Sequence, residues 1–179
     1  MKRILFASVL LAGAMALPAY AALTVGAKAP TFATQASLGG KHIDFNMADA
    51  LKKGPVVLYF YPAAFTMGCT IEAHEFAEAT DEFASMNATV VGVSADNLET
   101  LDRFSVEACR NKFAVAADPQ ATVIKSYEAE NTQRPGRAAR ISYVIAPDGN
   151  ILLSLQSNDP IEHVTKTKEA VKAYKAAHP

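Results

Sequence analysis

The stretch that decides the fold is VVLYFYPAAFTMGC, residues 56–69. Its first six residues are nearly all apolar and are rich in β-branched and aromatic side chains, which is typical of a strand buried on both faces. Pro62 ends this strand. From about Met67 the apolar side chains recur at helical spacing, and one helical face is expected to carry Cys69, Ala73, Phe76 and Phe83. A helix that directly follows a buried strand indicates an α/β fold.

The segments on either side of this stretch continue the alternation of strands and helices. Gly39-Gly40 predicts a hairpin near the N-terminus, and PDGN at residues 147–150 predicts another near the C-terminus. Further buried strands are expected at residues 89–93 and 114–117. Helices are expected at 47–52, after Asp96-Asn97 as far as Cys109, after Asp118-Pro119 and after Asp159-Pro160. This order predicts one thioredoxin-like α/β domain over residues 22–179, with a central mixed sheet flanked by helices and an N-terminal hairpin extension.

The first 21 residues have the pattern of a signal peptide. Lys2-Arg3 is a basic start, residues 4–17 form an apolar run, and AYA at residues 19–21 suits a signal peptidase. We expect cleavage after Ala21 and a periplasmic or secreted protein; a buried N-terminal helix and an uncleaved anchor are the alternatives. The apolar run is shorter than the roughly 20 residues of a spanning helix, so no integral membrane association is expected.

Composition narrows the range of partners. The chain carries 17 basic and 18 acidic residues, for a net charge of −1, and it has no basic run. Nucleic acid is therefore not an expected partner, because nothing in the sequence neutralises phosphates. The four histidines are scattered and neither cysteine belongs to a C-x-x-C pair, so no metal or other cofactor is expected. A monomer or a homodimer is expected.

The two cysteines, Cys69 and Cys109, allow two interpretations. In an exported protein they could form a structural disulfide, which would close a loop of about 40 residues and stabilise the fold by roughly 4 kcal/mol in the chain-entropy model. Alternatively Cys69 is a reactive thiol, because the first turn of a helix after a central strand favours the thiolate form. Thr66 can turn its hydroxyl toward that sulfur. Glu72 would oppose an anionic sulfur if it pointed toward it.

The string Pro62-x-x-x-Thr66-x-x-Cys69 resembles the active-site signature of the peroxiredoxins. The longer string FTMGCTxE at residues 65–72 is similar to their bacterioferritin-comigratory-protein branch, also called peroxiredoxin Q. Three further matches lie in the order expected for the family, at residues 26–32, 117–119 and 140–149. The resemblance covers the whole mature chain. It implies a thiol peroxidase that reduces hydrogen peroxide or organic hydroperoxides without a metal or prosthetic group.

The resemblance also implies a role for each matching residue. Cys69 would attack one peroxide oxygen and become a sulfenic acid. Thr66 would hydrogen-bond the sulfur and the peroxide, while Pro62 would shield the sulfur. Arg140 would hold both the thiolate and the peroxide through its fork of donors. Two nearby side chains are alternatives to this arginine: Arg134 and Arg137.

Cys109 is the candidate resolving cysteine under the same resemblance. Many members of the branch carry that cysteine five positions after the first, where this chain has His74, and others carry it on a later helix that we match to the one expected to hold Cys109. It would form an intramolecular disulfide with Cys69, which a thioredoxin-like protein or a low-molecular-weight thiol would reduce. A buried and inert Cys109 is the alternative. The remaining alternatives for function are a one-cysteine peroxidase resolved by an external thiol, an exported thiol-disulfide oxidoreductase and a non-enzymatic holdase.

Overall fold

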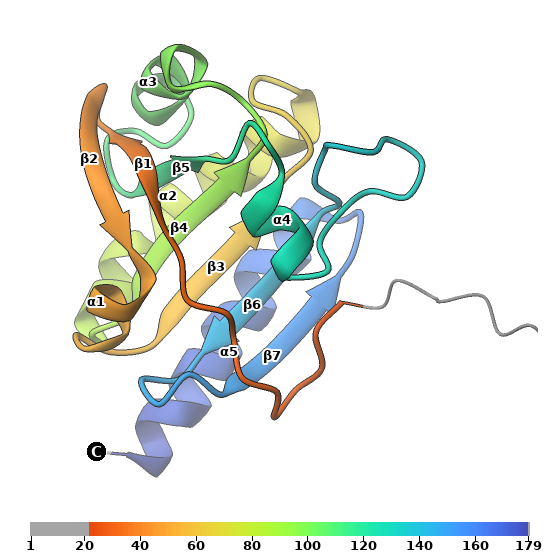
Figure 1. Ribbon diagram of the computed structural model, residues 1–179. Helices are drawn as coiled ribbons and strands as arrows, with labels where there is room; N and C mark the ends of the chain where they lie inside the picture. Colours follow the sequence, from red (N-terminus) through yellow and green to blue (C-terminus); the bar gives the residue numbers. More distant parts are fainter. Residues whose placement is uncertain (1–21, 179) are drawn as a thin grey trace, which may run out of the picture.

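The structure is a computed structural model that describes residues 22–178. The expected signal peptide, residues 1–21, lies outside the described residues. One mixed sheet contains seven strands: β1 (Ala33–Leu38), β2 (Lys41–Asn46), β3 (Val56–Phe60), β4 (Thr89–Ser94), β5 (Ala114–Ala117), β6 (Ile141–Ile145) and β7 (Ile151–Gln156). Their order across the sheet is β2-β1-β5-β4-β3-β6-β7 (Figure 1). The predicted central mixed sheet and N-terminal hairpin are confirmed.

The middle of the sheet is parallel and its edges are antiparallel. β4 pairs in parallel with β3 on one side and with β5 on the other. β6 pairs antiparallel with β3, and the β1–β2 and β6–β7 hairpins complete the two edges. Ile141, the first residue of β6, therefore lies opposite Phe60, the last residue of β3. This register brings the residue before β6 to the point where β3 ends.

Within residues 22–178, five helices accompany the sheet: α1 (Met47–Leu51), α2 (Met67–Ser85), α3 (Leu98–Glu107), α4 (Thr122–Ser126) and α5 (Pro160–Ala177). In the view of Figure 1, α2 and α5 lie behind the sheet and α4 lies in front of it. The start of α5 follows its predicted signal, because the Asp159 side chain accepts a hydrogen bond from the Ile161 N–H and Pro160 is the first helical residue. No helix among residues 22–178 is both long and apolar enough to cross a membrane.

Alternate residues of β3 enter two different cores. All five β3 residues are buried, as expected for a strand covered on both faces. One core, which we call the α2-side core, contains Val57, Tyr59 and Tyr61 together with apolar residues of α2, α3 and α5. The other, the α4-side core, contains Val56, Leu58 and Phe60 together with residues of α1 and α4. Both cysteines belong to the α2-side core.

The predicted extent of α3 is wrong at its C-terminal end. α3 stops at Glu107, so Cys109 lies in the turn that follows the helix rather than on it. The Cys109 N–H donates to the Phe104 carbonyl oxygen at 3.0 Å, one residue further back than in an α-helix. Arg110 and Asn111 follow with φ values of 51° and 60°. A left-handed backbone at this point ends a helix.

The start of α4 also differs from the prediction. The helix begins at Thr122 and not directly after Asp118-Pro119, because Ala121 has a left-handed backbone with φ 55°. Asp118 still accepts from the first turn, at 2.9 Å from the Thr122 N–H nitrogen and 2.8 Å from that of Ile124. The capping carboxylate was therefore identified, but the chain makes one extra turn before the helix.

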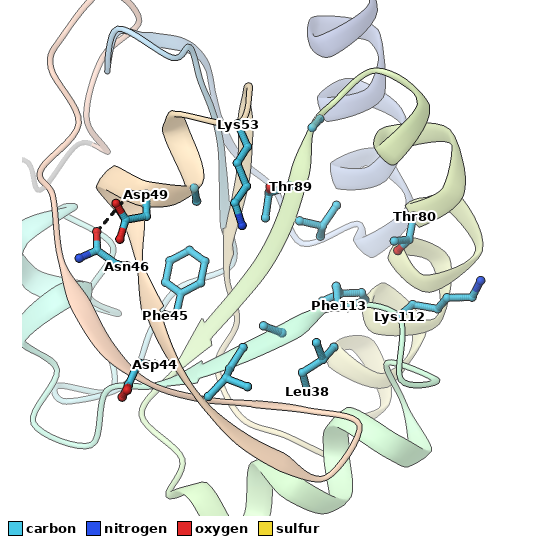
Figure 2. Close-up of a pocket in the computed structure, with 15 residues that line it drawn as sticks. Leu38, Asp44, Phe45, Asn46, Asp49, Lys53, Thr80, Thr89, Lys112 and Phe113 are labelled. Atoms are coloured by element: carbon cyan, nitrogen blue, oxygen red, sulfur yellow. Dashed lines mark hydrogen bonds between the residues drawn. The ribbon is translucent and has the colours of Figure 1, made fainter.

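A cavity of about 550 Å³ lies at the end of the sheet where β4 and β5 begin. Figure 2 shows Phe45 and Phe113 in its wall, with Lys53 and Asp49 nearer to α1. Neither cysteine lines it. Because Cys69 follows the opposite, carboxyl end of β3, this cavity is separate from the candidate site described next.

Candidate active site

Cys69 lies in the first turn of α2, just beyond the carboxyl end of the central strand β3. Thr66 precedes the helix with an extended backbone at φ −73° and ψ 148°. The first N–H groups of a helix have no intrahelical partner, and with the helix dipole they favour negative charge there. Cys69 is 1% exposed, whereas residues 65–67 are exposed. The sulfur is therefore buried directly beside an exposed loop.

Arg140 contacts the Cys69 sulfur, with Nη2 at 3.5 Å from Sγ. Arg140 is the residue before β6, and the pairing of β6 with β3 explains how it arrives at a cysteine 71 positions away in sequence. Arg137, one of the two alternatives, instead pairs with Asp96 at 3.0 Å. The arginine named from the resemblance is thus the one that the structure places at the sulfur. Its guanidinium places a hydrogen-bond donor directly at the sulfur.

Gly68 makes room for this guanidinium. A Cβ atom built on Gly68 would lie 2.9 Å from Arg140 Nη2, closer than real Cβ contacts. The glycine has no unusual φ, so its role here is spatial rather than conformational. The helix backbone at this position can therefore lie against the arginine that holds the sulfur.

Glu72 is the partner that the sequence did not identify as functional. It is fully buried, and its carboxyl group accepts a hydrogen bond from Arg140 Nη1. Burial raises the pKa of Glu72 to about 8, against the opposing influence of Arg140. Glu72 follows Cys69 by three residues and so lies on the same helical face, which is the signal that could have revealed it. The Glu72 carboxyl group and the Cys69 sulfur both accept from the Arg140 guanidinium.

His163 of α5 lies behind this carboxyl group. Its Nε2 is 3.0 Å from the Ser157 carbonyl oxygen, which can only accept, so Nε2 carries the proton. Its Nδ1 then accepts from the Ser142 hydroxyl at 2.7 Å and lies 3.8 Å from Glu72 Oε1. Burial lowers the pKa of His163, which favours this neutral form. The sequence pattern gives no sign of this packing, because it depends on how α2, β6 and α5 meet.

Asp96 fixes the loop between β3 and α2. Its Oδ2 accepts from the Ala64 N–H at 2.7 Å and from the Ser94 hydroxyl at 2.9 Å. The expectation that Asp96-Asn97 caps α3 is met by Asn97 alone, which accepts from the Thr100 N–H at 2.9 Å. Asp96 therefore anchors the loop that carries Thr66.

Thr66 and Pro62 flank the cysteine in different ways. The Thr66 hydroxyl donates to the Ala63 carbonyl oxygen at 3.0 Å, and no hydrogen bond joins it to Cys69 among residues 22–178. The predicted bond to the sulfur is thus not made here, because the hydroxyl donates to a carbonyl three residues back instead. Pro62 and Arg140 line a polar cavity of about 380 Å³. The other residues of this cavity are mostly polar: Glu128, Glu130, Asn131, Thr132, Gln133, Ala139, Ile141, Gln156 and Asn158.

Cys109 is fully buried in the α2-side core, and both cysteines are free thiols. Burial raises the pKa of Cys109, which keeps its thiol neutral and unreactive in this conformation. Unlike Cys69, it does not lie in the first turn of a helix, and no arginine within residues 22–178 donates a hydrogen bond to its sulfur. The two sulfur atoms are therefore in chemically different surroundings.

The arrangement suits nucleophilic chemistry at one sulfur. Within residues 22–178, no group of three or more His, Cys, Asp or Glu side chains could hold a metal ion. The site instead offers a thiol in the first turn of a helix. It also offers a guanidinium that contacts the sulfur and whose remaining donors can bind the oxygen atoms of a substrate.

Comparison with known proteins points to one family. The profile of the AhpC/TSA family matches residues 25–154. A putative peroxiredoxin of Helicobacter pylori is 39% identical over 107 residues, which are 60% of this chain and 67% of the relative. One from Mycobacterium tuberculosis is 33% identical over 129 residues, which are 70% of this chain and 83% of the relative. The crystal structure of the peroxidoxin BcpB from Mycobacterium tuberculosis has a TM-score of 0.75 and 29% identity, over 83% of this chain and 96% of that one. This match confirms the predicted thioredoxin-like fold.

Proposed function

Because the chain belongs to the AhpC/TSA family and is a thiol-dependent peroxidase of the peroxiredoxin type, we propose that Cys69 is its peroxidatic cysteine. The observation that carries this assignment is the 3.5 Å contact between Arg140 Nη2 and Cys69 Sγ in the first turn of α2. No cationic side chain among the described residues donates a hydrogen bond to the Cys109 sulfur, and its burial favours the neutral thiol. Of the two cysteines, only Cys69 is placed to react as a thiolate.

In the proposed first step the Cys69 thiolate attacks one oxygen of a hydroperoxide. The S–O bond forms as the O–O bond breaks, the sulfur is oxidised to a sulfenic acid, and the departing oxygen takes a proton to become water or an alcohol. Hydrogen peroxide and organic hydroperoxides both fit this chemistry. The Thr66 hydroxyl, which now donates to Ala63, can rotate to the peroxide when it enters.

Ionisation of a thiol by itself gives little acceleration. Lowering a cysteine pKa from about 8.5 to about 6 raises the thiolate fraction at pH 7 roughly 30-fold. The same change lowers the intrinsic nucleophilicity about 13-fold at a Brønsted slope of about 0.45, so the net gain is only about two-fold. The larger contribution must come from donors placed where charge develops on the breaking O–O bond. We assign that role to Arg140, Thr66 and the first N–H groups of α2.

In the proposed second step Cys109 attacks the sulfenic acid of Cys69. A disulfide forms, water leaves, and an external thioredoxin-like protein or low-molecular-weight thiol later reduces the bond. Both sulfurs are buried, and a disulfide needs Cα atoms within about 7 Å of each other. Because the two cysteines are free in this structure, we propose that the first turn of α2 and the turn after α3 rearrange between the two steps.

Stopped-flow reaction of the reduced protein with hydrogen peroxide and with cumene hydroperoxide tests the scheme. We expect Cys69→Ser to abolish peroxide consumption, and Cys109→Ser to accumulate a sulfenic acid at Cys69 that dimedone traps. Wild-type protein should yield one disulfide between the two cysteines in peptide mass spectra. Turnover by Cys109→Ser at the wild-type rate with a monothiol would indicate a one-cysteine peroxidase instead. Undiminished consumption in Cys69→Ser would contradict the assignment altogether.

The N-terminal sequence supports a proposed location in the periplasm or outside the cell. If the signal peptide is cleaved after Ala21, the mature protein begins at Ala22. Fractionation of cells that express the full chain, followed by N-terminal sequencing, tests this. A product that retains Met1 in the cytosolic fraction would contradict it.

A further inference from the structure

Tyr59 has a buried hydroxyl group with no hydrogen-bond partner among residues 22–178. The side chain is fully buried at the centre of β3, in the same α2-side core as both cysteines. A buried hydroxyl without a partner is uncommon in folded proteins and calls for a reason. The proposed mechanism does not yet use this group.

The protein makes room for this hydroxyl at a specific place. Gly92 lies opposite Tyr59 on β4, and a Cβ atom there would lie 2.7 Å from Tyr59 Cζ and 2.8 Å from its hydroxyl oxygen. The end of the tyrosine ring therefore crosses β4. On the far side of β4 lies β5, which the turn containing Cys109 precedes.

Aromatic residues at both ends of that turn pack against Tyr59 and Tyr61. Phe104, before the turn, stacks on Tyr61 with ring centroids 5.4 Å apart, and Phe113, after it, packs edge-on against Tyr59 at 5.9 Å. Cys109 lies between these two aromatic residues and donates its backbone N–H to the Phe104 carbonyl oxygen. The Tyr59 ring, the turn and the resolving thiol are thus neighbours in one core.

The ionisable groups around Tyr59 agree with this placement. Burial raises the pKa of Tyr59 well above its usual value, and Cys109 is the next contributor, followed by Tyr61, Glu72 and Cys69. The Tyr61 hydroxyl is also buried without a hydrogen-bond partner among the described residues, and Cys109 is likewise the next contributor to its raised pKa; for Tyr61, however, the Ser94 hydroxyl opposes the increase. Tyr59 therefore stays protonated and keeps its hydrogen available at any ordinary pH.

We propose that the Tyr59 hydroxyl is the donor that stabilises the Cys109 thiolate while this cysteine attacks the oxidised Cys69. The inference rests on the proposed function and assigns a positioning and activating residue to its second step. Cys109 loses its proton, its sulfur bonds to that of Cys69, and the hydroxide released from the sulfenic acid takes up a proton to leave as water. Tyr59 keeps its own proton throughout and donates only a hydrogen bond.

The step needs such a donor because the resolving thiol begins in an unfavourable environment. Burial in an apolar core raises the pKa of Cys109, and a buried thiolate without partners is costly. A hydrogen bond to a charged acceptor is stronger than one to a neutral group. The unpartnered hydroxyl therefore gains its partner only when Cys109 ionises and its sulfur turns toward Cys69.

Tyr59→Phe tests the inference, since it removes the hydroxyl and keeps the ring. Reduced protein is mixed with one equivalent of hydrogen peroxide and quenched with acid at intervals. Mass spectrometry then follows two signals: loss of the Cys69 thiol and appearance of the disulfide. We expect the disulfide to form about ten-fold more slowly in Tyr59→Phe, and its rate-against-pH curve to move about one unit higher. Circular dichroism and urea unfolding verify that the variant is folded.

Tyr143→Phe is the matched control. Its hydroxyl is also in the interior and donates to the Tyr127 carbonyl oxygen at 2.7 Å, but it belongs to the α4-side core, which contains no cysteine. We expect this variant to form the disulfide at the wild-type rate even if its stability falls. A wild-type rate and pH curve in Tyr59→Phe, or equal slowing in Tyr143→Phe, would overturn the inference. Failure of the proposed function is distinguishable, because wild-type protein would then lack either the sulfenic acid or the disulfide.

Discussion

At the scale of single residues, Arg140 divides its donors between the Cys69 sulfur and the Glu72 carboxyl group. Arg140→Lys keeps the charge but loses the planar fork that serves two acceptors at once. We expect the second-order rate of Cys69 oxidation by hydrogen peroxide to fall about 100-fold, as for the loss of one transition-state donor. Arg137→Lys, in the same loop but paired with Asp96, is the control and should stay within about two-fold of wild type. Similar losses in both variants would mean that the loop, and not the contact with sulfur, sets the rate.

At Gly68, the stability of α2 and the geometry of the active site are expected to favour different residues. Alanine is the better helix former, so Gly68→Ala should leave the free energy of unfolding unchanged or raise it by up to about 1 kcal/mol. Its Cβ would displace Arg140 Nη2, which lies 2.9 Å from that position. Peroxide reduction should therefore fall at least about ten-fold while the urea midpoint does not. An active Gly68→Ala variant would show that the guanidinium moves aside without consequence.

Glu72 predicts a pH dependence of stability with a definite sign. Burial raises its pKa from 4.5 to about 8, so between these values the folded protein binds a proton that the unfolded chain releases. Stability should fall as pH rises through this window, by at most about 1.4 kcal/mol per pH unit. Glu72→Gln lacks this contribution and keeps all other titrating groups. Urea unfolding of both proteins between about pH 5 and pH 8 should give curves that diverge, and parallel curves would contradict the prediction.

At the scale of elements, the pairing of β3 with β4 depends on the missing side chain of Gly92. A Cβ there would lie within 2.8 Å of three atoms of the buried Tyr59 ring. Gly92→Ala should therefore lower the free energy of unfolding by about 1–3 kcal/mol, the usual cost of overpacking a core. Tyr59→Leu, which shortens the opposing side chain, should relieve part of this cost in the double variant. Additive losses in the double-mutant cycle would show that the two residues do not meet.

Elements were predictable where local pattern and tertiary packing agree. β3 followed from its short apolar run, α2 from its apolar periodicity and α5 from Asp159-Pro160. The end of α3 and the start of α4 were missed because both depend on left-handed residues that are not glycine, among them Asn111 and Ala121. Asparagine tolerates this backbone and gives a weak local signal, but at Ala121 only the surrounding fold stabilises it.

The site shows the same division between local and tertiary information. Cys69 and its helix position could be predicted from the chain, and Arg140 from its place in the family pattern. Glu72 and His163 could not, because their roles arise where α2, β6 and α5 meet. The direction of the Thr66 hydroxyl was also missed, since a rotating group takes whichever acceptor is nearest.

At the scale of the whole molecule, the two thiols should differ strongly in reactivity although both are buried. Cys69 lies beside an exposed loop and an arginine, whereas burial in the core raises the pKa of Cys109. In reduced native protein, a pulse of iodoacetamide at neutral pH should modify Cys69 at least about ten-fold faster, because the thiolate is the nucleophile. Peptide mass spectrometry measures the two rates, and labelling in urea is the control in which the difference should disappear. Equal labelling of the native protein would contradict this asymmetry.

The sheet separates two hydrophobic cores, and this separation bears on the catalytic cycle proposed above. Both cysteines, the tyrosine proposed to assist them and the helix turns that must shift all belong to the α2-side core. The α4-side core, on the opposite face, holds β3 and β6 through residues that alternate with those of the first. In the resolving step that we propose, local unwinding around the two cysteines can therefore stay within the α2-side core while the α4-side core keeps the strands in place. Under that proposal, the return to the reduced conformation requires only local refolding on one face of the sheet.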